Sequence, residues 1–75
     1  REMAKHDVES EVTGNVWKVL LEAGTTVEVG DVIIILESMK MEIPVEATVA
    51  GTLVNVLVAP EEQVKEDQIL AVIEN

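Results

Sequence analysis

The stretch Glu37-Ser38-Met39-Lys40-Met41-Glu42-Ile43-Pro44 decides the fold, because it lies between two copies of one sequence pattern. A shift of 37 positions places residues 8–38 on residues 45–75 without a gap. Eight of the 31 pairs are identical, and the apolar positions of the two copies coincide along their length. Repeat arrays need three or more units, so two units in one short chain predict a fold with pseudo-two-fold symmetry.

Both copies are dominated by alternating and β-branched residues, and neither shows a helical period. We expect strands at about residues 6–11, 15–21, 31–37, 42–48, 52–58 and 68–74, and two short ones near 26–28 and 63–65. Eight short strands separated by turn residues predict an all-β sandwich or barrel.

Two turns differ between the copies. Gly24 and Gly30 punctuate the first copy, where positive φ is free only for glycine, and Glu61 and Asp67 replace them in the second. Pro60-Glu61 can form a type I turn, which needs no glycine. Aspartate tolerates left-handed geometry better than most residues, so we expect both turns to persist.

The composition predicts one domain of 75 residues with a core of Val, Ile and Leu. No cysteine is present, and we expect the only aromatic residue, Trp17, to be a packed strand residue. The net charge is −10 and the five basic residues are scattered, which excludes nucleic acid and anionic membranes as partners. Solubility explains this acidity, and docking to a basic face of a partner enzyme is an alternative.

The N-terminus has no apolar stretch of the kind found in signal peptides, and the run Val32–Leu36 is too short to cross a bilayer. We therefore expect a cytoplasmic protein. Residues 1–7 are expected to be an N-terminal extension, with Arg1 and Glu2 foreign to the natural protein if Met3 is its start. Excision from a longer polypeptide is an equal alternative.

Catalytic and metal sites are not predicted. The chain has one histidine and no cysteine or tyrosine, and its carboxylates lack the spacing of a metal site. His6 lies near a terminus without a partner fixed by the sequence, and we expect it to be solvated.

The hairpin tip around Lys40 breaks a local rule. Two-residue hairpin turns favour glycine-containing pairs because they need positive φ, and this tip has none. Such a conflict within a consistent pattern marks a candidate functional site. The amine of Lys40 is a good acylation target once neutral, and a long acid attached there would become a swinging arm.

Two methionines and two glutamates surround Lys40. Met39 and Met41 flank a charged residue at a turn, so at least one should face solvent rather than fill the core. Glu37 and Glu42 bracket the lysine symmetrically, and their simplest role would be cross-strand charge balance.

The segment Glu37 to Glu42 closely resembles the biotin-attachment motif of biotinyl domains, and the resemblance extends from about Val8 to Ile73. It includes Gly14, Val19, Gly24, Val27, Gly30-Asp31, the Met-Lys-Met tip and Gly51. Lipoyl domains share the fold but usually carry Asp-Lys-Ala at the tip. The resemblance therefore implies biotin on Lys40, with Met39, Met41, Glu37 and Glu42 as flanking recognition residues. A lipoate carrier and an unmodified interaction module are the alternatives.

The family fold is a flattened eight-stranded β-barrel of two four-stranded sheets, a barrel-sandwich hybrid, with the lysine hairpin at one end and both termini at the other. The resemblance implies a non-catalytic carrier over residues 8–75, with repeats 8–38 and 45–75 around the attachment hairpin 39–44, monomeric when isolated. Its partners would be a biotin protein ligase that uses ATP, a biotin carboxylase and a carboxyltransferase.

The sequence differs from many members of the family in two places, and these differences indicate which members it resembles most. Ser10-Glu11-Val12-Thr13-Gly14 stands where family members often have Ala-Pro-Met-Pro-Gly, and the protruding thumb of some bacterial acetyl-CoA carboxylase carriers is absent. The chain is more similar to small free-standing attachment proteins, or to the terminal domain of an acyl-CoA or pyruvate carboxylase.

Overall fold

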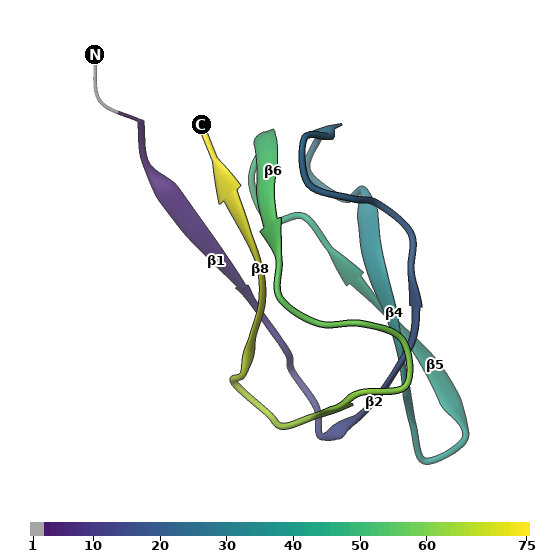
Figure 1. Cartoon of the computed structure of the whole chain (residues 1–75). Coiled ribbons are helices and arrows are strands. Elements are labelled where there is room, and N and C mark those ends of the chain that lie inside the picture. The colour runs from purple at the N-terminus through teal and green to yellow at the C-terminus, as the bar shows by residue number, and fades with distance from the viewer. Residues whose placement is uncertain (1–2) are drawn as a thin grey trace.

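The structure, a computed structural model, describes residues 3–75, so the expectation for Arg1 and Glu2 lies outside the described residues. Its elements are eight β-strands (Figure 1): β1 (Lys5–Glu9), β2 (Gly14–Val19), β3 (Thr26–Val27), β4 (Val32–Ser38), β5 (Met41–Glu46), β6 (Gly51–Val56), β7 (Gln63–Val64) and β8 (Ile69–Glu74). All eight predicted strands are confirmed. From residue 3 to residue 75 no helix has the length and hydropathy of a membrane span.

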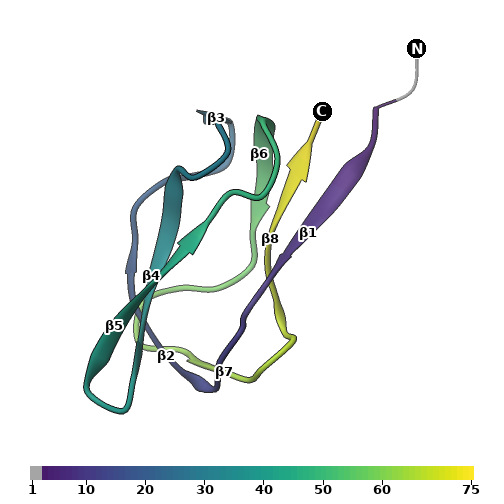
Figure 2. The same cartoon turned by 180° about the vertical axis from the view of Figure 1, so that it is seen from behind.

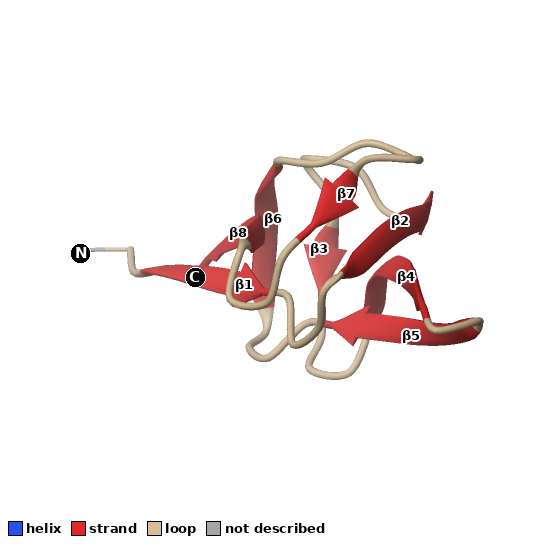
Figure 3. Cartoon of the chain, turned by 90° about the horizontal axis from the view of Figure 1, so that it is seen from below, coloured by secondary structure: helices blue, strands red, loops and turns tan. Residues whose placement is uncertain are grey.

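The strands form two four-stranded antiparallel sheets, which Figure 3 shows end-on. The first sheet has the order β1-β8-β6-β3 and the second has the order β5-β4-β2-β7. The 37-residue shift carries β1, β8, β6 and β3 onto β5, β4, β2 and β7, so the symmetry exchanges the two sheets. The predicted pseudo-two-fold barrel-sandwich is therefore confirmed.

The two sheets also bend at equivalent places. The register of β2 on β4 shifts between Val16 and Lys18, and the register of β6 on β8 shifts between Leu53 and Asn55. These positions are related by the same 37-residue shift. A bulge increases local twist and bends its strand, which lets each short sheet curve over the other.

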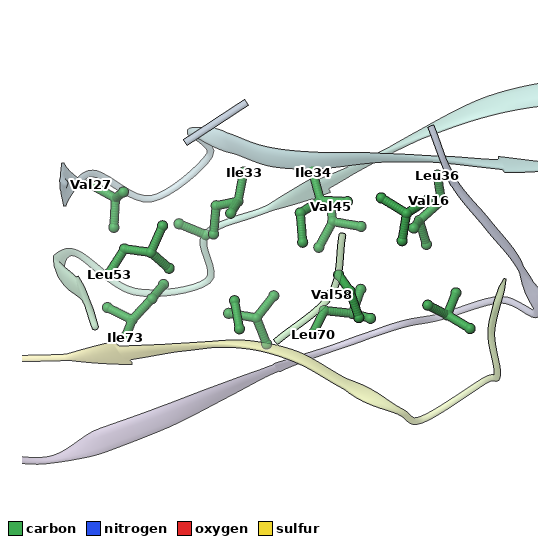
Figure 4. Close-up of a cluster of buried hydrophobic side chains, with 14 residues drawn as sticks. Val16, Val27, Ile33, Ile34, Leu36, Val45, Leu53, Val58, Leu70 and Ile73 are labelled. Atoms are coloured by element: carbon green, nitrogen blue, oxygen red, sulfur yellow. The ribbon is translucent and has the colours of Figure 1, made fainter. Parts of the chain in front are cut away.

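The core is aliphatic. Figure 4 shows side chains from both sheets meeting between them, with Ile33, Ile34, Leu36, Leu53, Leu70 and Ile73 fully buried. Trp17 does not join them: it is 42% exposed, and the prediction that it is a packed residue is wrong. Branched aliphatic side chains already fill the space between the sheets. In β2 the inward position belongs to Val16, so Trp17 at the bulge faces outward.

Both turns persist in the second copy with non-glycine residues in left-handed geometry. Gly24 and Gly30 have φ of 101° and 93°, and their equivalents Glu61 and Asp67 have φ of 75° and 70°. The amide of Glu62 donates to the carbonyl of Ala59 at 3.2 Å, closing a turn over Pro60-Glu61. A positive φ at its third residue makes this turn type II, so the expected type I turn is wrong. The expectation for Asp67 is confirmed.

The termini and the lysine hairpin lie at opposite ends of the molecule (Figures 1 and 2). Ala4 and Asn75 exchange two backbone hydrogen bonds of 3.0 Å, which joins the termini as neighbouring strand ends. The first strand begins at Lys5, so residues 5–7 of the expected N-terminal extension belong to the first sheet. His6 is half-buried, and its Nε2 lies 3.1 Å from Asn75 Oδ1 in an exposed hydrogen bond, so the histidine expected to be solvated keeps contact with solvent and gains a partner that the sequence does not fix.

Candidate functional site

The tip of the β4–β5 hairpin is a two-residue turn. Ser38 and Met41 form the last paired positions of the two strands, which leaves Met39 and Lys40 to reverse the chain. Their φ angles are 52° and 65°. Positive φ at both central residues is the mark of a type I′ turn, whose twist matches that of the strands. Left-handed geometry costs a non-glycine residue roughly 1–2 kcal/mol, which the pairing of β4 with β5 must offset.

The three residues at this tip all face solvent. Met39 is 91% exposed, Met41 is 64% exposed, and Lys40 is exposed as well. The prediction that at least one methionine faces solvent is thus confirmed for both. Thioether side chains normally fill gaps in cores. At this tip they add little to folding, which leaves them free for contacts with another molecule.

The end of β4 is held against the crossover that precedes β2. The hydroxyl of Ser38 donates to the carbonyl of Thr13 at 2.9 Å. A Cβ on Gly14 would lie within 3.0 Å of the Glu37 carbonyl oxygen and 3.2 Å from Ser38 Cβ, so only glycine permits this approach. The contact fixes the hairpin from which Lys40 projects. Sequence reasoning missed the roles of Thr13 and Ser38, although the identity of Gly14 with Gly51 in the repeat was a signal of close packing.

The two carboxylates at the base of the tip face each other. Glu37 and Glu42 are directly opposite in the register of β4 and β5, and both are exposed. Like charges in that position destabilise a sheet, so the expected charge balance is wrong. The equivalent pair in the other sheet is Glu74 and Lys5, which carry opposite charges. The fold therefore accepts oppositely charged residues at this pair of positions, and the sheet that carries Lys40 has two carboxylates there instead.

The geometry suits presentation of an amine to another enzyme. Lys40 combines a flexible four-carbon side chain with a rigid turn, and an amide at its Nζ would carry a tethered group beyond the protein surface. Among residues 3–75 no group of three or more acidic or histidine side chains has the arrangement of a metal site.

Comparison with known proteins agrees with this geometry. The profile of the family described as "Biotin-requiring enzyme" matches residues 4–73, nearly the whole chain. The chain belongs to this biotin-requiring family. Its resemblance to biotinyl domains is thereby confirmed.

Relatives of known name support the assignment. The biotinylated protein TB7.3 homolog of Mycobacterium leprae is 42% identical over 67 residues, covering 89% of this chain and 94% of that protein. The biotin/lipoyl attachment protein of Bacillus subtilis is 40% identical over 68 residues, covering 91% and 93%. The biotin-requiring family member described here is thus a biotin/lipoyl attachment domain, a carrier rather than a catalyst.

A solved structure extends the likeness to a large carboxylase. The urea carboxylase of Kluyveromyces lactis matches with a TM-score of 0.89 and 37% identity. The match covers 93% of this chain and 6% of that protein, so this biotin-requiring domain corresponds to a small part of that carboxylase.

Proposed function

We propose that this chain is a biotin carboxyl carrier that bears biotin on Lys40. A biotin protein ligase forms the amide between the biotin carboxyl group and Lys40 Nζ. A biotin carboxylase then loads a carboxyl group onto the ring, and a carboxyltransferase passes it to an acceptor. The domain itself holds the biotinylated Lys40 in place and extends it from the surface, and the cofactor and the partner enzymes carry out the chemistry. A cytoplasmic location and a monomeric isolated domain are parts of this proposal.

The single observation that carries the proposal is the placement of Lys40. It projects from a type I′ turn at the end of the molecule farthest from the termini (Figure 1), between two exposed methionines. An amine in that position enters a ligase active site without obstruction by the barrel. The match to the biotin-requiring family supports biotin as the cofactor.

Lipoate on Lys40 is the second candidate, because the Bacillus subtilis relative is named an attachment protein for either cofactor. Both would form the same amide on the same amine. The Met39-Lys40-Met41 tip favours biotin, since the tip of lipoyl domains usually has Asp-Lys-Ala.

The test is the intact mass of the protein after co-expression with a biotin protein ligase or with a lipoate ligase. We expect the mass of one biotinyl group in the first case and unmodified protein in the second. Lys40→Arg, which keeps the positive charge, is the matched control and should stay unmodified in both. Modification by the lipoate ligase alone would show that the domain carries lipoate instead of biotin. A protein that neither ligase modifies would be an interaction module.

A further inference from the structure

The outer face of the second sheet carries a hollow beside the attachment hairpin. Trp17 of β2 and Pro60 of the type II turn line it with apolar surface, and Glu37 and Glu61 line it with carboxylates. Its volume is about 480 Å³, and it opens to solvent. Trp17 is the only aromatic residue of the chain, and it is 42% exposed at this place. Tryptophan is one of the three residue types enriched among the residues that contribute most to binding in protein interfaces.

The symmetry of the fold supplies an internal comparison. The equivalents of Trp17, Pro60 and Glu61 on the first sheet are Val54, Ala23 and Gly24. That sheet has the same strand order and the same bulge with these smaller, uncharged residues. The barrel therefore does not need the indole, the proline or the Glu61 carboxylate at this position, and these three lie on the sheet that carries Lys40, whereas Glu37 has a carboxylate, Glu74, as its equivalent.

The two carboxylates that line the hollow favour a partner with a positively charged side chain. Glu37 and Glu61 place two carboxylates beside the indole, in a chain of net charge −10. Lys18 Nζ lies 4.3 Å from the centroid of the Trp17 ring, so the chain's own cation already contacts the indole and a partner's basic side chain would pair with the two carboxylates. A partner surface with an apolar patch and an arginine or lysine would match this face in both polarity and charge.

The length of the reacting side chain indicates which enzyme needs this contact. Glu37 lies three residues from Lys40, and the chain reverses between them, so the near rim of the hollow lies within about 10 Å of the tip. An enzyme that acts on the bare lysine must bring its surface to within one side chain of the tip, and so over this face. An enzyme that acts on the longer biotinylated arm can remain farther away.

We infer that the hollow between Trp17 and the Pro60-Glu61 turn is the docking site for a basic side chain on the biotin protein ligase that modifies Lys40. This inference rests on the proposed function. Trp17 and Glu61 act here as specificity determinants for the ligase and take no part in the acyl transfer itself.

The test is the steady-state kinetics of biotinylation of the apo domain by a biotin protein ligase. Trp17→Val and Glu61→Gly give the hollow the residues of its symmetric counterpart. We expect each to raise KM about tenfold or more with little change in kcat, because the lost contact is the same before and during acyl transfer. Leu57→Ala is the control, since Leu57 is 54% exposed but lies away from the hollow, and its KM should stay within twofold of wild type.

Binding is measured separately with the Lys40→Arg variant as an inhibitor that cannot be modified. Adding Trp17→Val to it should raise its inhibition constant by the same factor as the KM. Glu61→Gly should melt no lower than wild type, because glycine accepts the positive φ at that position without strain. A stable domain that is a poorer ligase substrate cannot be explained by misfolding.

Three results of these measurements would overturn the docking site or the proposed function. A KM within twofold of wild type for both Trp17→Val and Glu61→Gly would overturn the docking site while leaving biotinylation of Lys40 intact. An equal rise in KM for Leu57→Ala would overturn it too, because the effect would then not be specific to the hollow. Failure of the wild-type domain to be modified would instead remove the proposed function, and this inference with it.

Discussion

The close approach of Gly14 to β4 predicts that Gly14→Ala will disturb both stability and modification. The added Cβ would lie within 3.0 Å of the Glu37 carbonyl oxygen, a distance that real Cβ atoms essentially never show. Ordinary contact begins near 3.4 Å, and the opposing atom is backbone, so one of the two strands must move. Because Lys40 follows Glu37 by three residues, that movement reaches the attachment tip.

The size of the effect follows from the clash. Forcing an extra methyl group into packed structure costs roughly 1–3 kcal/mol. In a domain of this size each kcal/mol lowers the melting temperature by about 4–8 °C. We therefore expect Gly14→Ala to melt about 5–20 °C below wild type. A misplacement of about 1 Å can cost a reaction up to about 100-fold, so we expect kcat/KM for biotinylation to fall by about 10-fold to 100-fold.

The symmetry provides a matched control. A Cβ on Gly51 would lie 2.5 Å from the Glu74 carbonyl oxygen and 2.9 Å from Asn75 Cβ, a clash of the same kind at the end that holds the termini. Gly51→Ala should therefore lose similar stability while its biotinylation rate, measured well below both melting temperatures, stays within about twofold of wild type. Equal rates for the two variants would refute the idea that the Gly14 contact positions the tip. A wild-type melting temperature for Gly14→Ala would refute the clash itself.

Three further predictions concern the tip and the turns. Lys40→Arg should keep the wild-type melting curve but abolish biotinylation, because a guanidinium stays protonated and is not acylated. If peptide mapping of the wild-type protein found biotin on any other lysine, the assignment of Lys40 would be contradicted. Gly30→Ala should destabilise the domain by roughly 1–2 kcal/mol in a denaturant titration, because the φ of Gly30 is 93°. Asp67→Ala should destabilise the domain less, because that position already holds a side chain at a φ of 70°. Met39→Ala or Met41→Ala should leave biotinylation nearly intact but slow carboxyl transfer from the fully biotinylated domain, and turnover equal to wild type with a biotin carboxylase and carboxyltransferase pair would remove that role.

The strands and their symmetry were predictable from the sequence because they depend on local patterns. Alternating apolar residues place one face of each strand inward, and the 37-residue repeat requires both halves to adopt the same pairing. The Met39-Lys40 turn was equally visible, since it is the one reversal between two copies of the pattern. The conflict between its residues and the usual residues of a hairpin turn marks it as the candidate site from the sequence alone.

The misjudged residues are those whose surroundings come from distant parts of the chain. Composition predicted that Trp17 would be packed, but aliphatic side chains fill the narrow space between the sheets and leave the indole outside. Glu37 and Glu42 were expected to balance charge, but the register sets them opposite each other. Pro60-Glu61 was expected to form a type I turn, but the positive φ of Glu61 makes the turn type II.

The sequence by itself determined which residues form strands, where the chain reverses and which lysine stands at the reversal, because each follows from periodicity and spacing within one segment. Only the tertiary structure decided what lies beside that lysine. The packing of Gly14 on Glu37, the opposition of two carboxylates and the hollow between Trp17 and Pro60 join residues from separate strands and turns. Register, bulges and the approach of the two sheets set such neighbours, and these are fixed only when the whole barrel packs at once.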